Sequence, residues 1–290
     1  MRMPFERNLP TVAVGLDDLA EGDRKVLGFS ALAIDREQLP KLEQVAFSLL
    51  DLSGISEFHG RNFGPQYERF YDLFLGAVVK AIESSRHGHA LIRYQSAYQF
   101  RENSKRAEDL LSKSLLPKLS QPGARLENAL SECSGWMALL AHNWRDIAPG
   151  VPTAEVEMDS DRSKEPLKIE TLADGALRNG NWAVMTWHNA LCSVLEKKGF
   201  ATCRLARFRI VDSRDSVMVQ AADVLGNFSL SHLRFALGCK PGDSAAKKIH
   251  LLKKHLNPEL PDSISGWTCK GGKLSPGTSA EDFVLRVSME

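Results

Sequence analysis

The stretch that decides the fold is Ile210–Leu225, which reads Ile-Val-Asp-Ser-Arg-Asp-Ser-Val-Met-Val-Gln-Ala-Ala-Asp-Val-Leu. Its first residues are apolar and lead into an aspartate, which is typical of a buried strand followed by a polar turn. After the turn, the apolar residues recur with the period of a helix. We therefore expect a strand, a short turn and a helix that carries a carboxylate, Asp223.

The predicted helix has two faces. An apolar stripe at helical spacing predicts the face that packs on the core: Val217, Ala221, Val224, Leu225 and Phe228. A polar stripe lies beside it, at positions i, i+4, i+7 and i+11: Ser216, Gln220, Asp223 and Asn227. A carboxylate on a core-packed helix needs a partner, because burying an unpaired charge is costly. A metal ion or a cationic side chain would supply that partner.

Composition limits the function classes. The 290 residues can form one large domain or two small ones, and the net charge of +1 argues against a strongly basic nucleic-acid binder. No apolar run approaches ~18 residues and the N-terminus has none, so we expect neither a membrane span nor a signal peptide. The cysteines are scattered without a Cys-x-x-Cys pair, which indicates neither a zinc ribbon nor a disulfide framework. A reducing, cytoplasmic location follows as the prediction.

Apolar periodicity along the chain predicts an α/β protein. We expect strands at 11–16, 26–34, 90–100, 153–159 and 201–212, the first two forming a hairpin. We expect helices at 37–50, 67–84, 105–116, 126–144 and 182–198. Strands separated by helices imply a sheet with crossover connections.

The predicted domain organisation has one main unit. Residues 1–240 form the α/β domain, with a helical insertion at about 102–151. Residues 241–290 form a C-terminal extension that is first basic and then rich in Gly, Pro and Ser, with a short last strand at 283–287.

Acidic residues follow several of the predicted strands. Asp17 and Asp18 follow the first strand, Asp159 ends the 153–159 strand, and Asp212 ends the strand before the helix of Asp223. Ligands of open α/β sheets gather at the carboxyl ends of strands, so these acids are expected to converge. Several carboxylates around one point require cations, and hard oxygen ligands favour Mg²⁺ or Mn²⁺. Such ions suit the hydrolysis of phosphodiesters.

Each acid also has a purely structural explanation. Asp17 and Asp18 would start a turn, Asp159 would cap the segment after its strand, and Asp212 would be an N-cap. Asp223 would form an ion pair, for example with an arginine. A loop acid such as Glu57 is by default solvated, and a lone loop histidine such as His59 is more often structural than catalytic.

A basic segment after residue 240 is the candidate nucleic-acid contact. Its lysines lie at helical spacing around a small apolar stripe: Lys247, Lys248, Lys253 and Lys254. The alternative explanation is a solvated helix face whose leucines dock on the body of the protein.

Four segments together resemble the domain-of-unknown-function 3800 family. Val211–Gly226 resembles the C-terminal signature, in which a strand ends in Asp-Ser and a helix carries Gln-x-Ala-Asp. In the expected order, Val14–Asp18 resembles the first strand of the family, Glu57–Gly60 its Glu-x-His element, and Val156–Ser163 its strand ending in Asp. The resemblance covers about residues 11–237.

The resemblance implies a ribonuclease H-like mixed sheet flanked by helices and a metal-dependent nuclease or related phosphoryl-transfer activity, often encoded near mobile or defence genes. The implied acidic quartet that binds metal is Asp17, Glu57, Asp159 and Asp223, supported by Asp18, His59, Asp212 and Gln220. The first motif departs from the family pattern, because Asp-Asp-Leu-Ala (17–20) replaces Asp-Glu-Ser-Gly. That departure bears directly on the metal site.

Two hypotheses follow. The first is a nuclease that uses Mg²⁺ or Mn²⁺ and acts on DNA or RNA. The second is a non-catalytic ribonuclease H-like module that binds nucleic acid or a protein partner. A hydrolase that uses His59 or His188 with a cysteine or serine nucleophile has no supporting spacing, and no Gly-x-Ser-x-Gly elbow or phosphate-binding glycine loop is present.

Overall fold

The computed structural model describes residues 11–21, 26–102, 105, 133, 136–137, 140–141, 153–160, 170–171, 177–178, 180–200, 202–256, 264, 266–277 and 283–287. The strands are β1 (Val12–Glu21), β2 (Val26–Asp35), β3 (His89–Ser96), β4 (Thr153–Asp159), β5 (Glu170–Thr171), β6 (Leu177–Arg178), β7 (Arg204–Val211), β8 (Trp267–Lys270), β9 (Lys273–Pro276) and β10 (Phe283–Val287). The α-helices are α1 (Leu39–Ser53), α2 (Glu68–Glu83), α5 (Gly180–Glu196), α6 (Val217–Ala236) and α7 (Asp243–His255).

Within the described residues, six strands form one mixed sheet in the order β10-β3-β2-β1-β4-β7. β2 runs antiparallel to both of its neighbours, whereas β1, β4 and β7 run parallel. A 3-2-1-4-5 order with strand 2 reversed is the ribonuclease H-like arrangement, so the predicted fold class is confirmed. β10 adds to the outer edge of β3 and runs antiparallel to it.

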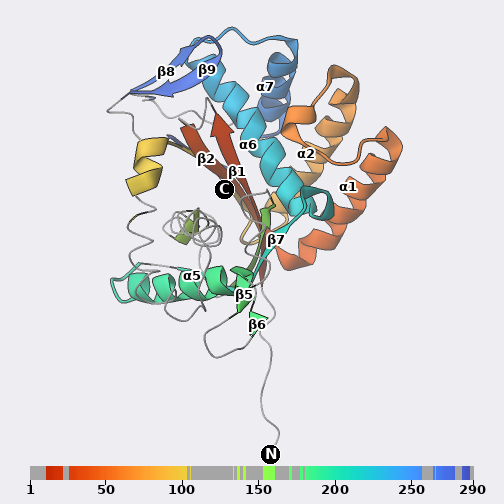
Figure 1. Cartoon of the computed structure of the whole chain (residues 1–290). Helices are drawn as coiled ribbons and strands as arrows, with labels where there is room; N and C mark the ends of the chain where they lie inside the picture. Colours follow the sequence, from red (N-terminus) through yellow and green to blue (C-terminus); the bar gives the residue numbers. More distant parts are fainter. Residues whose placement is uncertain are drawn as a thin grey trace, which may run out of the picture.

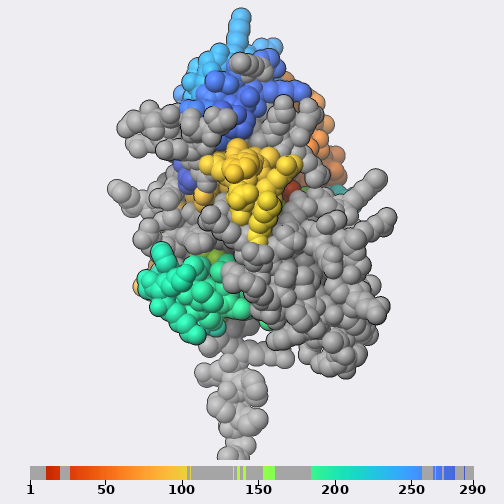
Figure 2. All heavy atoms as spheres, turned by 60° about the vertical axis from the view of Figure 1, so that its left-hand side comes forward, coloured from red at the N-terminus to blue at the C-terminus, as the bar shows by residue number. Residues whose placement is uncertain are grey.

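Helices cover both faces of the sheet (Figure 1). α1, α2 and α6 enclose one core with the sheet, and α7 contributes to it through Leu251 and Leu252. α5 packs on the opposite face through Val184, Trp187 and Leu195. Figure 2 shows that second face, where α5 lies below the helical residues 97–102. The sheet is therefore the middle layer of three.

α6 crosses the sheet in direct contact with β1. A Cβ atom on Gly15 would lie 2.1 Å from the carbonyl oxygen of Met218, so only glycine admits this approach. Because side chains alternate along a strand, Gly15 and Asp17 point to the face that α6 covers. The close crossing thus brings the polar stripe of α6 over the sheet face that carries Asp17.

Two sequence expectations need correction. β1 does not end before Asp17: it stays paired with β2 as far as the Glu21–Val26 pair, so Asp17 and Asp18 lie inside a strand rather than at a turn. The scattered cysteines also do not exclude a disulfide, because Cys239 and Cys269 are bonded. This bond joins the turn after α6 to β8, and it forms because the fold brings together two cysteines 30 residues apart.

The segment after residue 240 is built into the fold. The predicted strand at 283–287 is present as β10, and the lysine-rich stretch is α7, which packs on α6 and α2. The predicted helices at 105–116 and 126–144 lie almost wholly outside the described residues. No helix among the described residues has the length and apolar content needed to cross a membrane.

Candidate functional site

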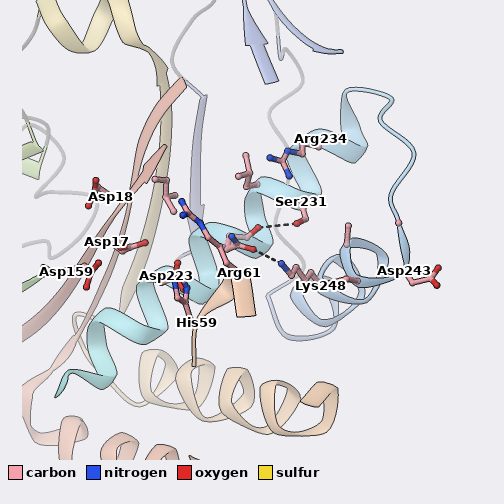
Figure 3. Close-up of a pocket in the computed structure, with 16 residues that line it drawn as sticks. Asp17, Asp18, His59, Arg61, Asp159, Asp223, Ser231, Arg234, Asp243 and Lys248 are labelled. Carbon is pink, nitrogen blue, oxygen red and sulfur yellow. Dashed lines mark hydrogen bonds and ion pairs between the residues drawn. The ribbon is translucent and has the colours of Figure 1, made fainter. Parts of the chain in front are cut away.

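A cavity of about 990 Å³ opens where β1 and β4 meet α6 and the start of α7 (Figure 3). We call it the acid pocket, because five aspartates line it: Asp17, Asp18, Asp159, Asp223 and Asp243. Three of the four predicted metal ligands therefore share one cavity, although 206 positions separate Asp17 from Asp223 (223 − 17). The sheet order causes this convergence, because β1 and β4 are neighbours and α6 crosses them.

Asp17 and Asp159 come from adjacent parallel strands. The last printed pair of the two strands is Leu16–Met158, and Asp17 and Asp159 are the next residues of each. Neighbouring strands lie ~4.8 Å apart and alternate side chains share a face, so the two carboxylates are neighbours on the α6 side. Asp17 is buried and Asp159 half-buried.

Asp223 holds the loop between α1 and α2 in place. Its Oδ2 accepts a hydrogen bond from the Gly60 amide at 2.5 Å and contacts Nδ1 of His59. The hydrogen bond to Asp223 is the main cause of a raised pKa at His59, which also lines the acid pocket. The sequence predicts a metal ion or a cationic side chain as the partner of this buried acid. The observed partners are a histidine and a backbone amide, not an arginine.

The rest of the α6 polar stripe makes equally specific contacts. Gln220 is fully buried, and its side chain accepts from the Phe58 amide at 2.9 Å while donating to the Ser213 carbonyl at 3.0 Å. Ser216 caps α6 by accepting from the Val219 amide, and its hydroxyl donates to Glu157 at 2.6 Å. The predicted supporting residue Gln220 thus fixes the 57–60 loop against α6.

Two predicted acids lie elsewhere. Glu57 is not among the residues that line the acid pocket, and its Oε2 accepts from the Ser213 hydroxyl at 2.6 Å. Asp212 caps the 3-10 turn Ser213–Asp215 by accepting from the Arg214 amide at 3.0 Å, and it pairs with the Arg214 guanidinium. The N-cap explanation for Asp212 is therefore confirmed. Of the four predicted metal ligands, Asp17, Asp159 and Asp223 line this cavity and Glu57 does not.

Basic side chains line the same cavity. Arg61 comes from the 3-10 turn Gly60–Asn62, Arg234 from the last turns of α6 and Lys248 from α7. Lys248 donates to Oδ1 of Asn227 at 2.8 Å and lies over the rings of Phe63 and Phe228, each 5.8 Å away. Burial lowers the pKa of Lys248 to about 8. Sequence reasoning missed Arg61 and Arg234, which carry no local signal.

The other lysines of the predicted basic patch have structural contacts. Lys247 pairs with Glu68 and Lys254 with Asp72, both on α2, and Lys253 lies over the ring of Phe235. Of the four predicted nucleic-acid-binding lysines, Lys248 is the one that lines the acid pocket. Leu251 and Leu252 dock α7 on the body of the protein, as the alternative explanation expected, whereas Lys247 and Lys254 pair with acids instead of being solvated.

A second polar cavity, of about 400 Å³, lies on the same side of the sheet and is called the arginine pocket. The buried Glu155 contacts the guanidinium groups of Arg36, Arg207 and Arg209. Glu157 contacts Arg209 as well. Glu155 and Glu157 are therefore neutralised by direct contacts with arginines.

The fit of a metal ion to the acid pocket depends on donor type and spacing. Among the residues that the structure describes, no three acidic, histidine or cysteine side chains lie close enough together to hold a metal ion. The neighbouring carboxylates of Asp17 and Asp159 do supply the hard oxygens that Mg²⁺ takes, and Mg²⁺ commonly binds through one or two carboxylates plus water and substrate phosphate. The pocket therefore fits one such ion better than a cage of four protein ligands.

His188 and Cys192 lie close together, but they do not form a reactive pair. Nε2 of His188 lies 3.3 Å from Sγ of Cys192, but both side chains are buried. Burial lowers the pKa of His188 to about 4 and raises that of Cys192 to about 11. The thiol keeps its proton at neutral pH, so this pair is not an activated nucleophile.

The fold and the cavity define an α/β protein of the ribonuclease H-like class with an acidic site at the end of its sheet. No family model matches the chain and no curated protein matches its sequence, so the resemblance to the domain-of-unknown-function 3800 family stays a prediction. A solved structure, the ribonuclease H2 from Pyrococcus horikoshii OT3, is distantly similar, with 11% identity and a TM-score of 0.31 over 84% of this chain and 99% of that chain. The fold assignment here rests on the strand order, not on that similarity.

Proposed function

We propose that this protein is a metal-dependent nuclease that hydrolyses phosphodiester bonds in the acid pocket. The observation that carries the proposal is the convergence of Asp17, Asp159 and Asp223 from three distant segments on one cavity. The cofactor is Mg²⁺ or Mn²⁺, the substrate is DNA or RNA, and the compartment that we propose remains the cytoplasm. The Cys239–Cys269 bond does not favour that compartment, because disulfides are rare in reducing surroundings.

The residues have separable roles. Asp17 and Asp159 would hold the ion, which when bound stabilises negative charge on the phosphate and favours ionisation of the attacking water. Asp223 shapes the wall formed by α6 and the 57–60 loop, because it fixes the Gly60 amide and the His59 ring there. Gln220 and Ser216 keep α6 in register with the loop and with β4.

The test is cleavage of single-stranded and double-stranded DNA and RNA with Mg²⁺ or Mn²⁺. Asp17→Asn, Asp159→Asn and Asp223→Asn should each abolish most cleavage. Asp212→Asn is the matched control, because this carboxylate is exposed, paired with Arg214 and outside the cavity. Cleavage that survives all three pocket substitutions, or that falls equally in the control, contradicts the proposal.

The second candidate is a non-catalytic module that binds nucleic acid. Two observations favour it. Among the described residues, no three acidic, histidine or cysteine side chains could hold a metal ion, and the motif at 17–20 differs from the family pattern. Calorimetric titration with Mn²⁺ separates the two candidates. The nuclease should bind Mn²⁺, and Asp17→Asn should remove the binding heat; the module should show none while still binding an oligonucleotide.

A further inference from the structure

The three basic side chains of the acid pocket come from helices and a loop, whereas three of its five aspartates come from strands. Figure 3 shows Asp17, Asp18 and Asp159 together on the sheet side, while Arg234 and Lys248 reach in from α6 and α7. Arg61, from the turn Gly60–Asn62, lines the same cavity. The strand wall therefore carries aspartates alone among its charged side chains, whereas the wall made by helices and a loop carries the three cations together with Asp223 and Asp243.

Lys248 is the most informative of these cations. It comes from a helix in which two other lysines, Lys247 and Lys254, pair with Glu68 and Asp72 of α2. Among the described residues, no carboxylate forms a salt bridge with Lys248, whose hydrogen-bond acceptor is the neutral amide oxygen of Asn227. The nearby charge of Asp223 favours this ammonium group, but its partial burial outweighs that effect and has a cost. An anion that enters the cavity would offset that cost.

We infer that Arg61, Arg234 and Lys248 form a phosphate-binding wall for the backbone of a nucleic-acid strand. The inference deepens the proposed function and rests on it, because it assigns the strand phosphates next to the reacting bond to this wall. The guanidinium groups of Arg61 and Arg234 offer paired donors for phosphate oxygens, and Lys248 contributes a point charge. This binding needs no divalent cation, since the protein itself supplies the positive charges.

The start of α7 is consistent with an anion at this wall. Gly242, Asp243 and Ser244 line the cavity, and the N-cap Gly242 provides no side-chain cap for the first turn. Its backbone amides and the positive end of the helix dipole favour negative charge nearby. Asp243 points away from Arg61 and Arg234 (Figure 3). The three side chains carry the inference, and the helix start adds to them.

The experiment measures binding without cleavage. Fluorescein-labelled single-stranded DNA and RNA of the same sequence are titrated with the full chain in EDTA, over a range of NaCl concentrations. Lys248→Met and Arg61→Gln should each weaken binding about tenfold and reduce the slope of log Kd against log salt by about 0.7, the value for one lost contact to a single strand. Lys80→Met, which removes an exposed lysine of α2 outside the cavity, should change neither quantity.

Each outcome decides one point. Arg61 is exposed on a loop, so Arg61→Gln keeps the test valid if Lys248→Met fails to fold in a thermal melt. Weaker binding by the two wall variants supports the inference even if the wild type never cleaves with Mg²⁺, in which case only the nuclease proposal fails. Wild-type binding that is undetectable at low salt, or identical for the wall variants and Lys80→Met, overturns the inference.

Discussion

The acid pocket and the arginine pocket lie on the same side of the sheet, and both are lined by acidic and basic side chains. The two cavities differ in what these charges contact. In the arginine pocket, guanidinium groups contact Glu155 and Glu157 directly, and Glu155 alone contacts three of them. In the acid pocket, Lys248 bonds a neutral amide and Asp223 contacts a histidine and a backbone amide. Glu155 and Glu157 stabilise the fold through their ion pairs, whereas Lys248, which forms no salt bridge with the described residues, can act on a ligand.

Acidic residues of β4 line both cavities. Glu155 and Glu157 belong to the arginine pocket, and Asp159, two residues further on the same face, belongs to the acid pocket. One strand therefore carries structural acids at its middle and a candidate catalytic acid at its end. The position along the strand, not the residue type, decides the role.

The largest expected effect is the loss of cleavage when a carboxylate of the acid pocket is removed. Asp159→Asn should lower the rate of metal-dependent cleavage by about 10³-fold, because it removes a carboxylate proposed to hold the ion that stabilises transition-state charge. Its midpoint of urea unfolding should stay near that of the wild type, since Asp159 lies at the end of β4 and is half-buried. Cleavage within threefold of wild type, as a rough limit, would place the chemistry elsewhere.

The second-largest expected effect is on stability, and it concerns the disulfide next to the phosphate-binding wall. The Cys239–Cys269 bond fixes the turn that follows the helix of Arg234. Cys239→Ser should lower the free energy of unfolding by about 3.5 kcal/mol, the order expected for closing a loop of this length. Urea unfolding with and without dithiothreitol measures it: the reductant should destabilise the wild type and leave the variant unchanged. A wild type insensitive to the reductant would contradict the prediction.

Breaking the arginine pocket should affect stability rather than activity. Glu155→Gln removes the charge that joins three guanidinium groups, so unfolding should require about 2 kcal/mol less, an amount moderated by the solvent exposure of the arginines. Cleavage per folded molecule should remain within about twofold, since Glu155 does not line the acid pocket. A large loss of cleavage with unchanged stability would reverse the roles of the two cavities.

The smallest effect is the pH dependence of binding. Because burial lowers the pKa of Lys248 to about 8, this ammonium loses its charge as the pH rises through that value. Oligonucleotide affinity in EDTA should therefore fall a few-fold across pH 8, with Kd measured by fluorescence anisotropy. Lys248→Arg should flatten the profile, because a guanidinium stays charged. An equal fall in both proteins would assign the effect to another group.

The sequence predicts the elements of this fold better than it predicts the site. The 153–159 strand and the strand–turn–helix at 210–225 have strong local periodicity, and both are present. Asp17, Asp159 and Asp223 could be chosen because strand ends converge in α/β sheets. Arg61 and Arg234 could not be, because their position at the cavity depends on how α6 packs, and no local pattern reports that packing.

The edge of the sheet has a practical consequence for anyone who shortens this chain. β10 comes from the last described residues of the sequence, yet it pairs along the outer side of β3 from Phe283–Tyr94 to Val287–Ala90. Removing it would bare the amide and carbonyl groups of a strand whose Leu91 and Ile92 are fully buried. Such an edge is a template for pairing with other chains. A trimmed protein would then be prone to self-association for reasons unrelated to its chemistry.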